Sequence, residues 1–410
     1  MSNETAESKD LIPDGASPSD RRAKTIRLKD IAELAGVHVT TVSSVLSPRA
    51  NSRIRVSEKT TARIQELAKR LNYRPHWHAQ IMRKRKTGLI GLIEFGRSEI
   101  HNTRMRELVR TVRAEGYRAL TSNVLWYDDN LDGSGVKAAI DFVIGAQVEG
   151  VILITPAARL APSDLYEIQN AGIPCVAFNG VHFPWIPQVR SNVAEGAETL
   201  TRHLLSLGRK RLVLVNTWGT PQKDENANWP TLERIAGFTK AIQSAGGTVV
   251  DGLESLRKIP RSSQQITGGL FVSDKKPLYS DMLVGYQLTT ELFEAGEYPD
   301  ALFCSNDQYA AGAYRACFEK GVRIPEQVAI VGFAGEAGTR FFCPALTTVD
   351  TLAPSNAKTV MDMLMELIRQ ERPINDDVLL KTPCQLIIRE SCGSNLGREK
   401  LTPIRMSDLP

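Results

Sequence analysis

Apolar residues near the start of the chain recur with the period of an α-helix. The first stripe occupies positions i, i+3, i+4 and i+7 and consists of Leu28, Ile31, Ala32 and Ala35. Gly36 follows it and allows a tight turn. The next segment has an apolar stripe of Val42, Val45 and Leu46 opposite a polar face of Thr40, Ser43, Ser44 and Ser47. Two short helices joined by such a turn predict a helix-turn-helix.

A third short helix is predicted after Ser57, whose hydroxyl suits the N-cap position. Its apolar face consists of Ile64, Leu67, Ala68 and Leu71. The segment at residues 72–75, which closes with Pro75, ends this helix. Three helices of this size bury one small core and leave the second helix free to enter the major groove of DNA.

Beyond residue 87 the pattern changes to short, nearly continuous hydrophobic runs. They cover residues 88–93, 151–154, 175–178, 212–215, 301–304 and 328–331. Runs of this kind suit parallel strands that are buried on both faces. Helical patterns lie between them, for example at residues 194–207 and 306–320. The alternation predicts doubly wound α/β units with right-handed crossovers.

Charge separates these two parts of the chain. Residues 21–86 contain 17 Lys and Arg against four Asp and Glu, a net charge of +13. The whole chain carries +5, so the other residues together carry −8. The positive excess coincides with the predicted helix-turn-helix, where DNA phosphates require that sign. Basic side chains that are only solvated are the alternative explanation.

Composition sets wider bounds. A chain of 410 residues with 42% hydrophobic content is long enough for two or three packed domains and a small headpiece. No apolar run approaches the ~20 residues that a membrane span needs. Residues 1–24 lack the apolar core of a signal peptide, so we expect a disordered tail, a cytoplasmic protein and no membrane partner. The six cysteines include no Cys-x-x-Cys pair, so neither a disulfide framework nor a zinc site is expected.

Open α/β sheets also host enzymes, so an α/β enzyme with a DNA-binding headpiece is the alternative class. The sequence lacks a Gly-x-Gly-x-x-Gly after the first strand, a phosphate-binding Gly-rich loop, a Gly-x-Ser-x-Gly elbow and a His-Glu-x-x-His motif. His76 and His78 flank Trp77, but this spacing places them on different sides of a helix. We therefore expect no enzyme activity, no cofactor and no metal. A purely architectural DNA-binding protein would not need so large an α/β body.

Four motifs resemble, in order and spacing, the N-terminal region of the LacI/GalR family of bacterial transcriptional regulators. They lie at residues 28–37 (LKDIAELAGV), 41–43 (TVS), 56–60 (VSEKT) and 71–75 (LNYRP). The resemblance extends over about residues 25–393. It implies an α/β chain with a three-helix helix-turn-helix headpiece and a hinge helix. Two doubly wound α/β subdomains of periplasmic-binding-protein type would follow, with a ligand cleft between them.

The resemblance implies five parts of the chain. They are a disordered tail at residues 1–24, the DNA-binding domain at 25–75, a hinge helix and linker at 76–87, an effector-binding and dimerisation domain at 88–393, and a tail at 394–410. The first subdomain is expected at about residues 88–189 and 352–382, and the second at about 190–351 with the final strand.

The resemblance also implies which residues contact DNA. Family members read bases with the first two residues of the recognition helix and with an Arg after the Val-Ser pair. These positions are Val39, Thr40 and Ser44 here. Since Ser bonds bases more weakly than Arg, we expect fewer guanine contacts. For Val39, a partly buried side chain that touches no base is the alternative. The residues expected at phosphates are His38, Thr41 and Ser43.

Two further segments are expected at DNA. The loop at residues 48–55 is longer than in relatives, and its Arg53 and Arg55 are expected to contact phosphates, a solvated loop being the alternative. Residues 76–85 resemble the hinge helix, which enters the minor groove at the centre of a palindrome. Met82 holds the wedge position, and Ala79 keeps the surface small enough for a partner helix. The resemblance thus implies a homodimer on palindromic double-stranded operator DNA.

The effector residues that the resemblance implies are Asn179, Arg234 and Asn306, whose donors suit hydroxyl groups or a carboxylate. Asp307 is expected to cap the helix that follows it. Sugar-binding relatives commonly carry an Asp where this chain has Ala334. Either Glu336 takes over that role or the ligand is not a simple hexose.

Aromatic side chains give weaker indications about the ligand. Phe183, Trp185 and Tyr279 are candidates for stacking on it or for the core, and Trp218 and Trp229 bracket a predicted lid loop. We predict a homodimeric repressor of carbohydrate-utilisation genes whose operator affinity is modulated by a small-molecule effector. A regulator that responds to a non-sugar ligand is the alternative.

Overall fold

The chain divides into two compact units, residues 1–86 and residues 87–410. The computed structural model describes residues 26–46, 56–71, 73, 86–95, 99–124, 134–154, 160, 162–180, 182–217, 229–260, 262–273, 281–351, 353–373 and 377–394. Each unit is built around cores of its own, so each is described by itself.

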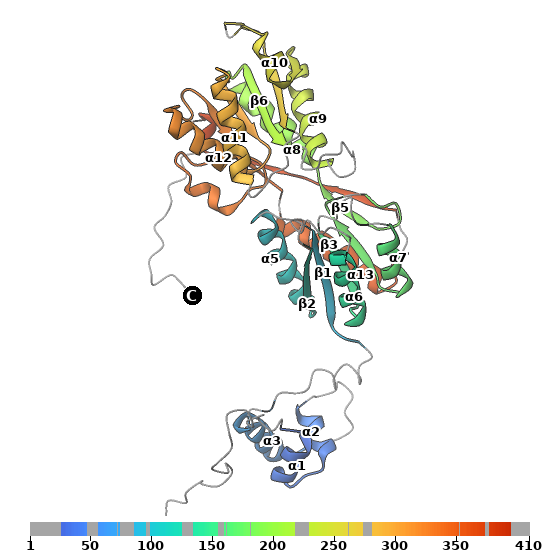
Figure 1. Ribbon diagram of the computed structural model, residues 1–410. Coiled ribbons are helices and arrows are strands. Elements are labelled where there is room, and N and C mark those ends of the chain that lie inside the picture. Colours follow the sequence, from blue (N-terminus) through green and yellow to red (C-terminus); the bar gives the residue numbers. More distant parts are fainter. Residues whose placement is uncertain are drawn as a thin grey trace, which may run out of the picture. The chain divides into compact units, whose positions relative to one another are not determined.

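The N-terminal unit is a bundle of short helices, α1 (Leu28–Ala35), α2 (Val39–Leu46) and α3 (Glu58–Arg70) (Figure 1). Ile31, Val42 and Ile64, one from each helix, are completely buried and form the centre of its core. The predicted stripes therefore face inward as expected. Burial of these side chains, rather than helix propensity alone, stabilises helices this short.

The first subdomain of the second unit holds a six-stranded parallel sheet in the order β12-β5-β4-β3-β1-β2. Its strands are β1 (Leu89–Phe95), β2 (Arg118–Val124), β3 (Gly150–Ile154), β4 (Cys175–Phe178), β5 (Gln188–Ser191) and β12 (Leu379–Thr382). Its helices are α5 (Glu99–Ala114), α6 (Ser134–Gly145), α7 (Pro162–Asn170) and α13 (Ala353–Ile368). Apolar side chains of α5 and α13 pack on one face of this sheet. Figure 1 shows both helices beside its strands.

The second subdomain holds a five-stranded parallel sheet in the order β10-β9-β6-β8-β7. Its strands are β6 (Arg211–Thr217), β7 (Thr248–Asp251), β8 (Thr267–Ser273), β9 (Ala301–Cys304) and β10 (Ala329–Val331). Its helices are α8 (Val193–Ser206), α9 (Trp229–Ser244), α10 (Gly252–Arg257), α11 (Asp281–Glu294) and α12 (Asp307–Lys320). Helices α8 and α9 pack on one face, and α10, α11 and α12 pack on the other.

The chain passes between the subdomains three times. It does so after β5, after β11 (Thr348–Asp350) and after β12, which is followed by β13 (Gln385–Ile387). Strands β11 and β13 pair antiparallel. The remaining elements are two short 3-10 helices, η1 (Ala337–Phe341) and η2 (Glu390–Cys392). Each of the six predicted hydrophobic runs overlaps a strand, with only Gly88 and Val328 lying just before theirs, and the two predicted helical patterns match α8 and α12 to within one residue.

Candidate functional site

Local hydrogen bonds hold the first two helices of the headpiece at a tight turn. Gly36 ends α1 in the left-handed conformation, with φ of 57°, which glycine adopts without strain. The next residues start α2, where the Thr41 amide donates to the His38 carbonyl at 2.9 Å. His38 Nδ1 lies 2.8 Å from Thr40 Oγ1, so these two side chains are fixed together at the start of α2.

The start of α2 is open to solvent. Val39 is 37% exposed, and His38 and Thr40 are exposed as well, whereas Val42 is completely buried. Thr41, Ser43 and Ser44 are half-buried. An exposed valine is available for the apolar contact that a thymine methyl group accepts.

Helix α3 is fixed at its start and tied to α1. The Ser57 hydroxyl accepts from the Thr60 amide at 3.2 Å, so Ser57 is the predicted N-cap. The Arg63 guanidinium donates to the carbonyl of Ala35, the last residue of α1. The exposed basic side chains of this unit include Arg27, Lys29, Lys59, Lys69 and Arg70. The headpiece thus combines a rigid core with a positively charged surface.

In the second unit, two of the three candidate ligand residues, Asn179 and Asn306, lie where strands end, and the third, Arg234, lies in α9. Ligands of open parallel sheets bind outside the carboxyl ends of the strands, at the point where the strand order reverses. In the first sheet this point lies between β1 and β3, and in the second between β6 and β9. Asn179 directly follows β4, and Asn306 follows β9 after one residue.

Asn179 is buried and locked in place. Its backbone is left-handed, with φ of 55°, a conformation that Asn tolerates better than most residues. Its Oδ1 accepts from the Ser191 amide at 3.0 Å, and Gln188 Nε2 donates to its carbonyl at 2.9 Å. Its Nδ2 is buried and has no hydrogen-bond partner among the residues that the structure describes. This donor is therefore available to a ligand.

Asn306, rather than Asp307, caps α12. Its Oδ1 accepts from the Tyr309 amide at 2.8 Å, and its Nδ2 donates to Asp281 at 3.0 Å. The predicted capping role of Asp307 is thus wrong, because Asn306 precedes the first turn and already occupies the cap position.

Asp307 instead joins α12 to the segments that follow β10. Its Oδ1 accepts from the Thr348 hydroxyl at 2.5 Å, and its Oδ2 accepts from the Glu336 amide at 2.7 Å. A Cβ on Gly332 would lie 2.2 Å from the Asp307 carboxylate, so only glycine allows this approach. Burial raises the pKa of Asp307 to about 6, although both hydrogen bonds favour its charged form.

Two arginines, one from each subdomain, lie close enough to interact electrostatically. Arg104 of α5 lies over the Phe178 ring, with 5.9 Å between its guanidinium carbon and the ring centre. Arg234 of α9 lies over the Phe333 ring at 5.0 Å. Burial lowers the pKa of each arginine to about 10, and the positive charge of Arg104 further lowers that of Arg234.

Two contacts join the subdomains beside these arginines. Arg190 of β5 lies over the Trp229 ring at the start of α9, at 4.7 Å. Lys381 of β12 forms an ion pair with Glu233 of α9 at 2.9 Å. Trp229 and Glu233 both belong to α9, so the two contacts hold this helix against the first subdomain. Glu233 directly precedes Arg234 in the same helix.

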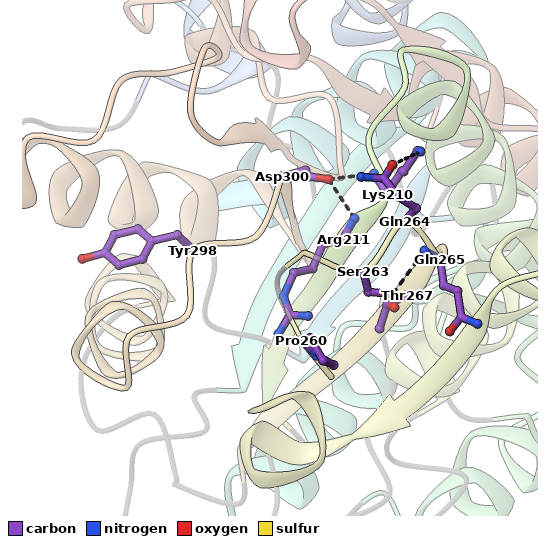
Figure 2. Close-up of a pocket in the computed structure, with 9 residues that line it drawn as sticks. All are labelled: Lys210, Arg211, Pro260, Ser263, Gln264, Gln265, Thr267, Tyr298 and Asp300. Carbon is purple, nitrogen blue, oxygen red and sulfur yellow. Dashed lines mark hydrogen bonds between the residues drawn. The ribbon is translucent and has the colours of Figure 1, made fainter. Parts of the chain in front are cut away.

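A cavity of about 190 Å³ lies at the opposite, amino-terminal edge of the second sheet. Figure 2 shows Asp300 facing the start of β6, where its carboxylate accepts from the amides of Lys210 and Arg211 at 2.8 and 2.9 Å. Arg211 is also paired with Glu297 at 2.6 Å. None of the predicted ligand residues lines this cavity.

The other sequence predictions have mixed outcomes. Trp185 stacks on Tyr166 with 5.5 Å between ring centres, and Phe183 is buried. Arg53, Arg55, Ala79, Met82, Trp218 and Tyr279 lie outside the described residues. Within the described ranges, no group of three or more metal-ligating side chains is found, and no helix is long and apolar enough to cross a membrane.

Sequence reasoning missed Arg104 and Arg190. Neither belongs to a motif, and each acts through an aromatic ring that lies far from it along the chain, Phe178 for Arg104 and Trp229 for Arg190. The sequence signal that was available is weak. Arg104 stands in the first helix after the first strand, a usual place for ligand contacts in open α/β sheets.

Two family models match this chain. Residues 27–76 match that of bacterial regulatory proteins of the lacI family, and residues 201–392 match that of periplasmic binding protein-like domains. The probable HTH-type transcriptional repressor ExuR of Bacillus subtilis (strain 168) is 26% identical over 369 residues, which cover 89% of this chain and 98% of the relative. The HTH-type transcriptional repressor PurR of Haemophilus influenzae (strain PittEE) is 26% identical over 375 residues, which cover 90% and 99%.

Solved structures show the same fold. The lac repressor dimer bound to operator and the anti-inducer ONPF is 22% identical, with a TM-score of 0.68, over 90% of this chain and 99% of that one. The transcriptional regulator CelR in complex with cellobiose is 20% identical, with a TM-score of 0.57, over 89% and 99%. The predicted fold class, a helix-turn-helix headpiece followed by two α/β subdomains, is confirmed.

Proposed function

Because the chain belongs to the LacI family of bacterial regulatory proteins, we propose that it is a sequence-specific DNA-binding repressor whose operator affinity is modulated by a small-molecule effector. One observation carries this proposal. A basic helix-turn-helix whose second helix is exposed at its start precedes a two-subdomain α/β body, in which Asn179 at the end of β4 carries an unsatisfied donor. The first part suits DNA, and the second suits a small polar ligand.

For DNA recognition, we assign base contacts to Val39 and Thr40 at the exposed start of α2 and to Ser44 further along the same helix. We assign phosphate contacts to His38, Thr41 and Ser43, and to Arg53 and Arg55 in the loop before α3. The contact between His38 and Thr40 supports this, because it fixes both side chains before DNA is bound. Phosphate contacts position the helix, and base contacts specify the sequence.

A homodimer on a palindromic operator follows from the same assignment. The lac repressor of similar fold is a dimer bound to its operator. A two-fold symmetric protein requires two half-sites, one for each headpiece. Met82 would act as the minor-groove wedge of the hinge helix, which lies with its linker at residues 76–87, and Ala79 would face the partner helix.

The effector would bind between the subdomains of the domain at residues 88–393, with Asn179, Arg234 and Asn306 as its contacts. A carbohydrate is our first candidate, since a regulator of similar fold binds cellobiose. A non-sugar ligand is the second candidate, because Ala334 stands where many sugar-binding relatives carry an Asp. Glu336, the other carboxylate considered for that role, is bound to Asp307 through its backbone amide. The relatives that align with nearly the whole chain are transcriptional repressors, so we assign no enzyme activity. We place the protein in the cytoplasm, where the DNA of a bacterium lies.

Selection from random DNA with the full-length protein tests this function. We expect a two-fold symmetric site to be enriched, and Thr40→Ala to change the preferred half-site. Gln65→Ala, on the exposed face of α3, is the control and should leave the site unchanged. Enrichment of no symmetric site, or binding that is equal on all sequences, would refute a sequence-specific repressor.

A further inference from the structure

Arg104 and Arg234 are an unusual pair, because two half-buried positive charges repel each other. Neither guanidinium has a carboxylate within 4.0 Å among the residues that the structure describes, and the Nε atom of each is buried without a hydrogen-bond partner there. Leaving buried charge uncompensated costs stability. Such an arrangement is retained where a bound anion supplies the missing charge.

The two side chains come from different subdomains, and the charge of Arg104 acts on Arg234. Arg104 is held against Phe178 at the carboxyl end of β4, and Arg234 against Phe333 just after β10. The thiol of Cys384, between β12 and β13 where the chain crosses over, lies within electrostatic reach of both arginines. An anion that touches both guanidinium groups would therefore join the subdomains beside the crossover.

Nearby carboxylates indicate how much charge the anion carries. Glu94 at the end of β1 acts on Arg104, and Asp281 at the start of α11 acts on Arg234, both from beyond ion-pair distance. They already offset part of the positive charge, so a monoanion fits better than a phosphate dianion. The planar guanidinium groups also match the two oxygens of a carboxylate.

We propose that the effector carries a carboxylate and that this group binds Arg104 and Arg234 together, one guanidinium from each subdomain. The proposal rests on the proposed function, because it names the ligand class of the same cleft. The buried Nδ2 of Asn179, which no described group accepts, is a further donor for the hydroxyl groups of a sugar acid.

Matched pairs of compounds test the proposal on the full-length protein. The probes are D-glucuronate with D-glucose, D-galacturonate with D-galactose, and D-gluconate with D-sorbitol, together with D-glucose 6-phosphate and inorganic phosphate. The measurements are the thermal midpoint and the Kd by calorimetry at equal concentrations. We expect at least one acid to bind while its neutral partner does not. Equal binding of acid and neutral sugar, binding of phosphates alone, or binding of none of the acids would overturn the carboxylate assignment.

Variants separate a ligand contact from a structural role. Arg104→Gln should weaken binding of the acid by about 10- to 100-fold, as expected for the loss of a charged hydrogen bond. Without ligand, its thermal midpoint should not fall below that of the wild type, because one of two repelling charges is gone. Arg202→Gln, which removes an exposed arginine of α8, is the control and should leave the Kd unchanged. An unchanged Kd in Arg104→Gln would contradict the proposal.

Two further measurements keep the outcome clear. If Arg104→Gln does not fold, Arg104→Lys is the second variant. Lysine retains the charge but cannot form bidentate hydrogen bonds with a carboxylate, so this variant should still weaken binding of the acid. DNA binding is measured on the same preparations. If the wild-type protein binds specific DNA but none of the acids, only the carboxylate assignment is refuted. If the wild-type protein shows no specific DNA binding, the proposed function itself is refuted.

Discussion

Ser44 stands at the position where the resemblance to the family implies an arginine. It is half-buried in α2, away from the buried Val42. We predict that Ser44→Arg shifts the preferred half-site toward a guanine-containing sequence, because a guanidinium there would reach guanine O6 and N7. A good bidentate pair contributes roughly 1–3 kcal/mol of discrimination. Selection from random DNA measures the shift.

The control for this substitution is Gln65→Arg, which adds the same charge on the exposed face of α3. It should raise the overall affinity for DNA without changing the selected site. If Ser44→Arg behaves in the same way, position 44 faces the phosphate backbone, and α2 is rotated by about a quarter turn from the orientation assigned to it.

Asp307 makes stability depend on pH in an unusual direction. Its pKa is raised to about 6 in the folded chain, so the folded state holds the proton more tightly than the unfolded state, whose ordinary value is about 3.9. The free energy of unfolding should therefore fall as pH rises from about 4 to about 6, by up to about 3 kcal/mol, and Asp307 adds no further change above that range.

Asp307→Asn should abolish this contribution. Asn can accept from the Glu336 amide through Oδ1 and donate to the Thr348 hydroxyl through Nδ2, so both contacts survive without charge. Urea unfolding at several pH values between about 4 and 7 measures the difference from the wild type. Asp362→Asn, on the exposed side of α13, is the control. Identical pH dependence in wild type and Asp307→Asn would contradict the prediction.

At the scale of the residue, sequence and structure agree where one local signal decides the outcome. Ser57 and Gly36 were recognisable as caps because hydroxyl and glycine chemistry suffices at those positions. Arg104 was not recognisable, because its role depends on Phe178 and Arg234, which only the folded chain brings near it. Asp307 was misassigned because Asn306, one residue earlier, competes for the same cap.

Among the elements, helices α11 and α12 pack unusually closely through glycine. A Cβ on Gly312 would lie 2.0 Å from the Met282 carbonyl oxygen and 2.4 Å from the Tyr286 nitrogen. Backbone atoms cannot give way as side chains do, so we predict that Gly312→Ala lowers the free energy of unfolding by about 3 kcal/mol. Urea unfolding measures this change.

A glycine in open space provides the comparison for Gly312. A Cβ on Gly145, at the end of α6, would meet no described atom within 4 Å beyond its own helix and chain neighbours. Gly145→Ala should leave stability unchanged or raise it by about 0.5–1 kcal/mol, as expected for alanine in a helix. A loss in Gly145→Ala equal to that in Gly312→Ala would show that close packing is not the cause.

The strands that could be predicted are the fully buried apolar ones. Strands β1, β3, β4, β6, β9 and β10 are buried hydrophobic runs, including β10 at the edge of the second sheet. The edge strands β2 and β12 gave no such signal, because one side of each meets solvent. Arg118–Val124 (β2) is half-exposed along its length, and Leu379–Thr382 (β12) is mostly exposed. Their pairing is fixed by neighbours in the sheet that are distant in sequence.

For the whole molecule, the uneven distribution of charge predicts how DNA binding responds to salt. The net charge of +13 in residues 21–86 implies that many phosphates are neutralised. The logarithm of affinity should therefore fall steeply and linearly with the logarithm of salt concentration. Arg53→Ala should weaken binding to all sequences alike and reduce that slope by about one. Fluorescence anisotropy at several salt concentrations measures both effects.

The control removes a positive charge from the other unit. Lys258→Ala, at the exposed end of α10, should leave the slope unchanged. A slope that is the same in Arg53→Ala and the wild type would remove Arg53 from the residues that contact phosphates.

The three crossings between subdomains also determine the order in which the protein is completed during synthesis. The headpiece core closes once Tyr73 has been made. The first sheet lacks its edge strand until Thr382, and the core of the second subdomain lacks a residue until Cys392. At roughly 5–20 residues per second, about 300 residues separate these events by about 15–60 s. A nascent chain on the ribosome thus carries a finished, positively charged headpiece, able to hold nucleic acid through its phosphates, well before the part of the molecule that regulates it exists.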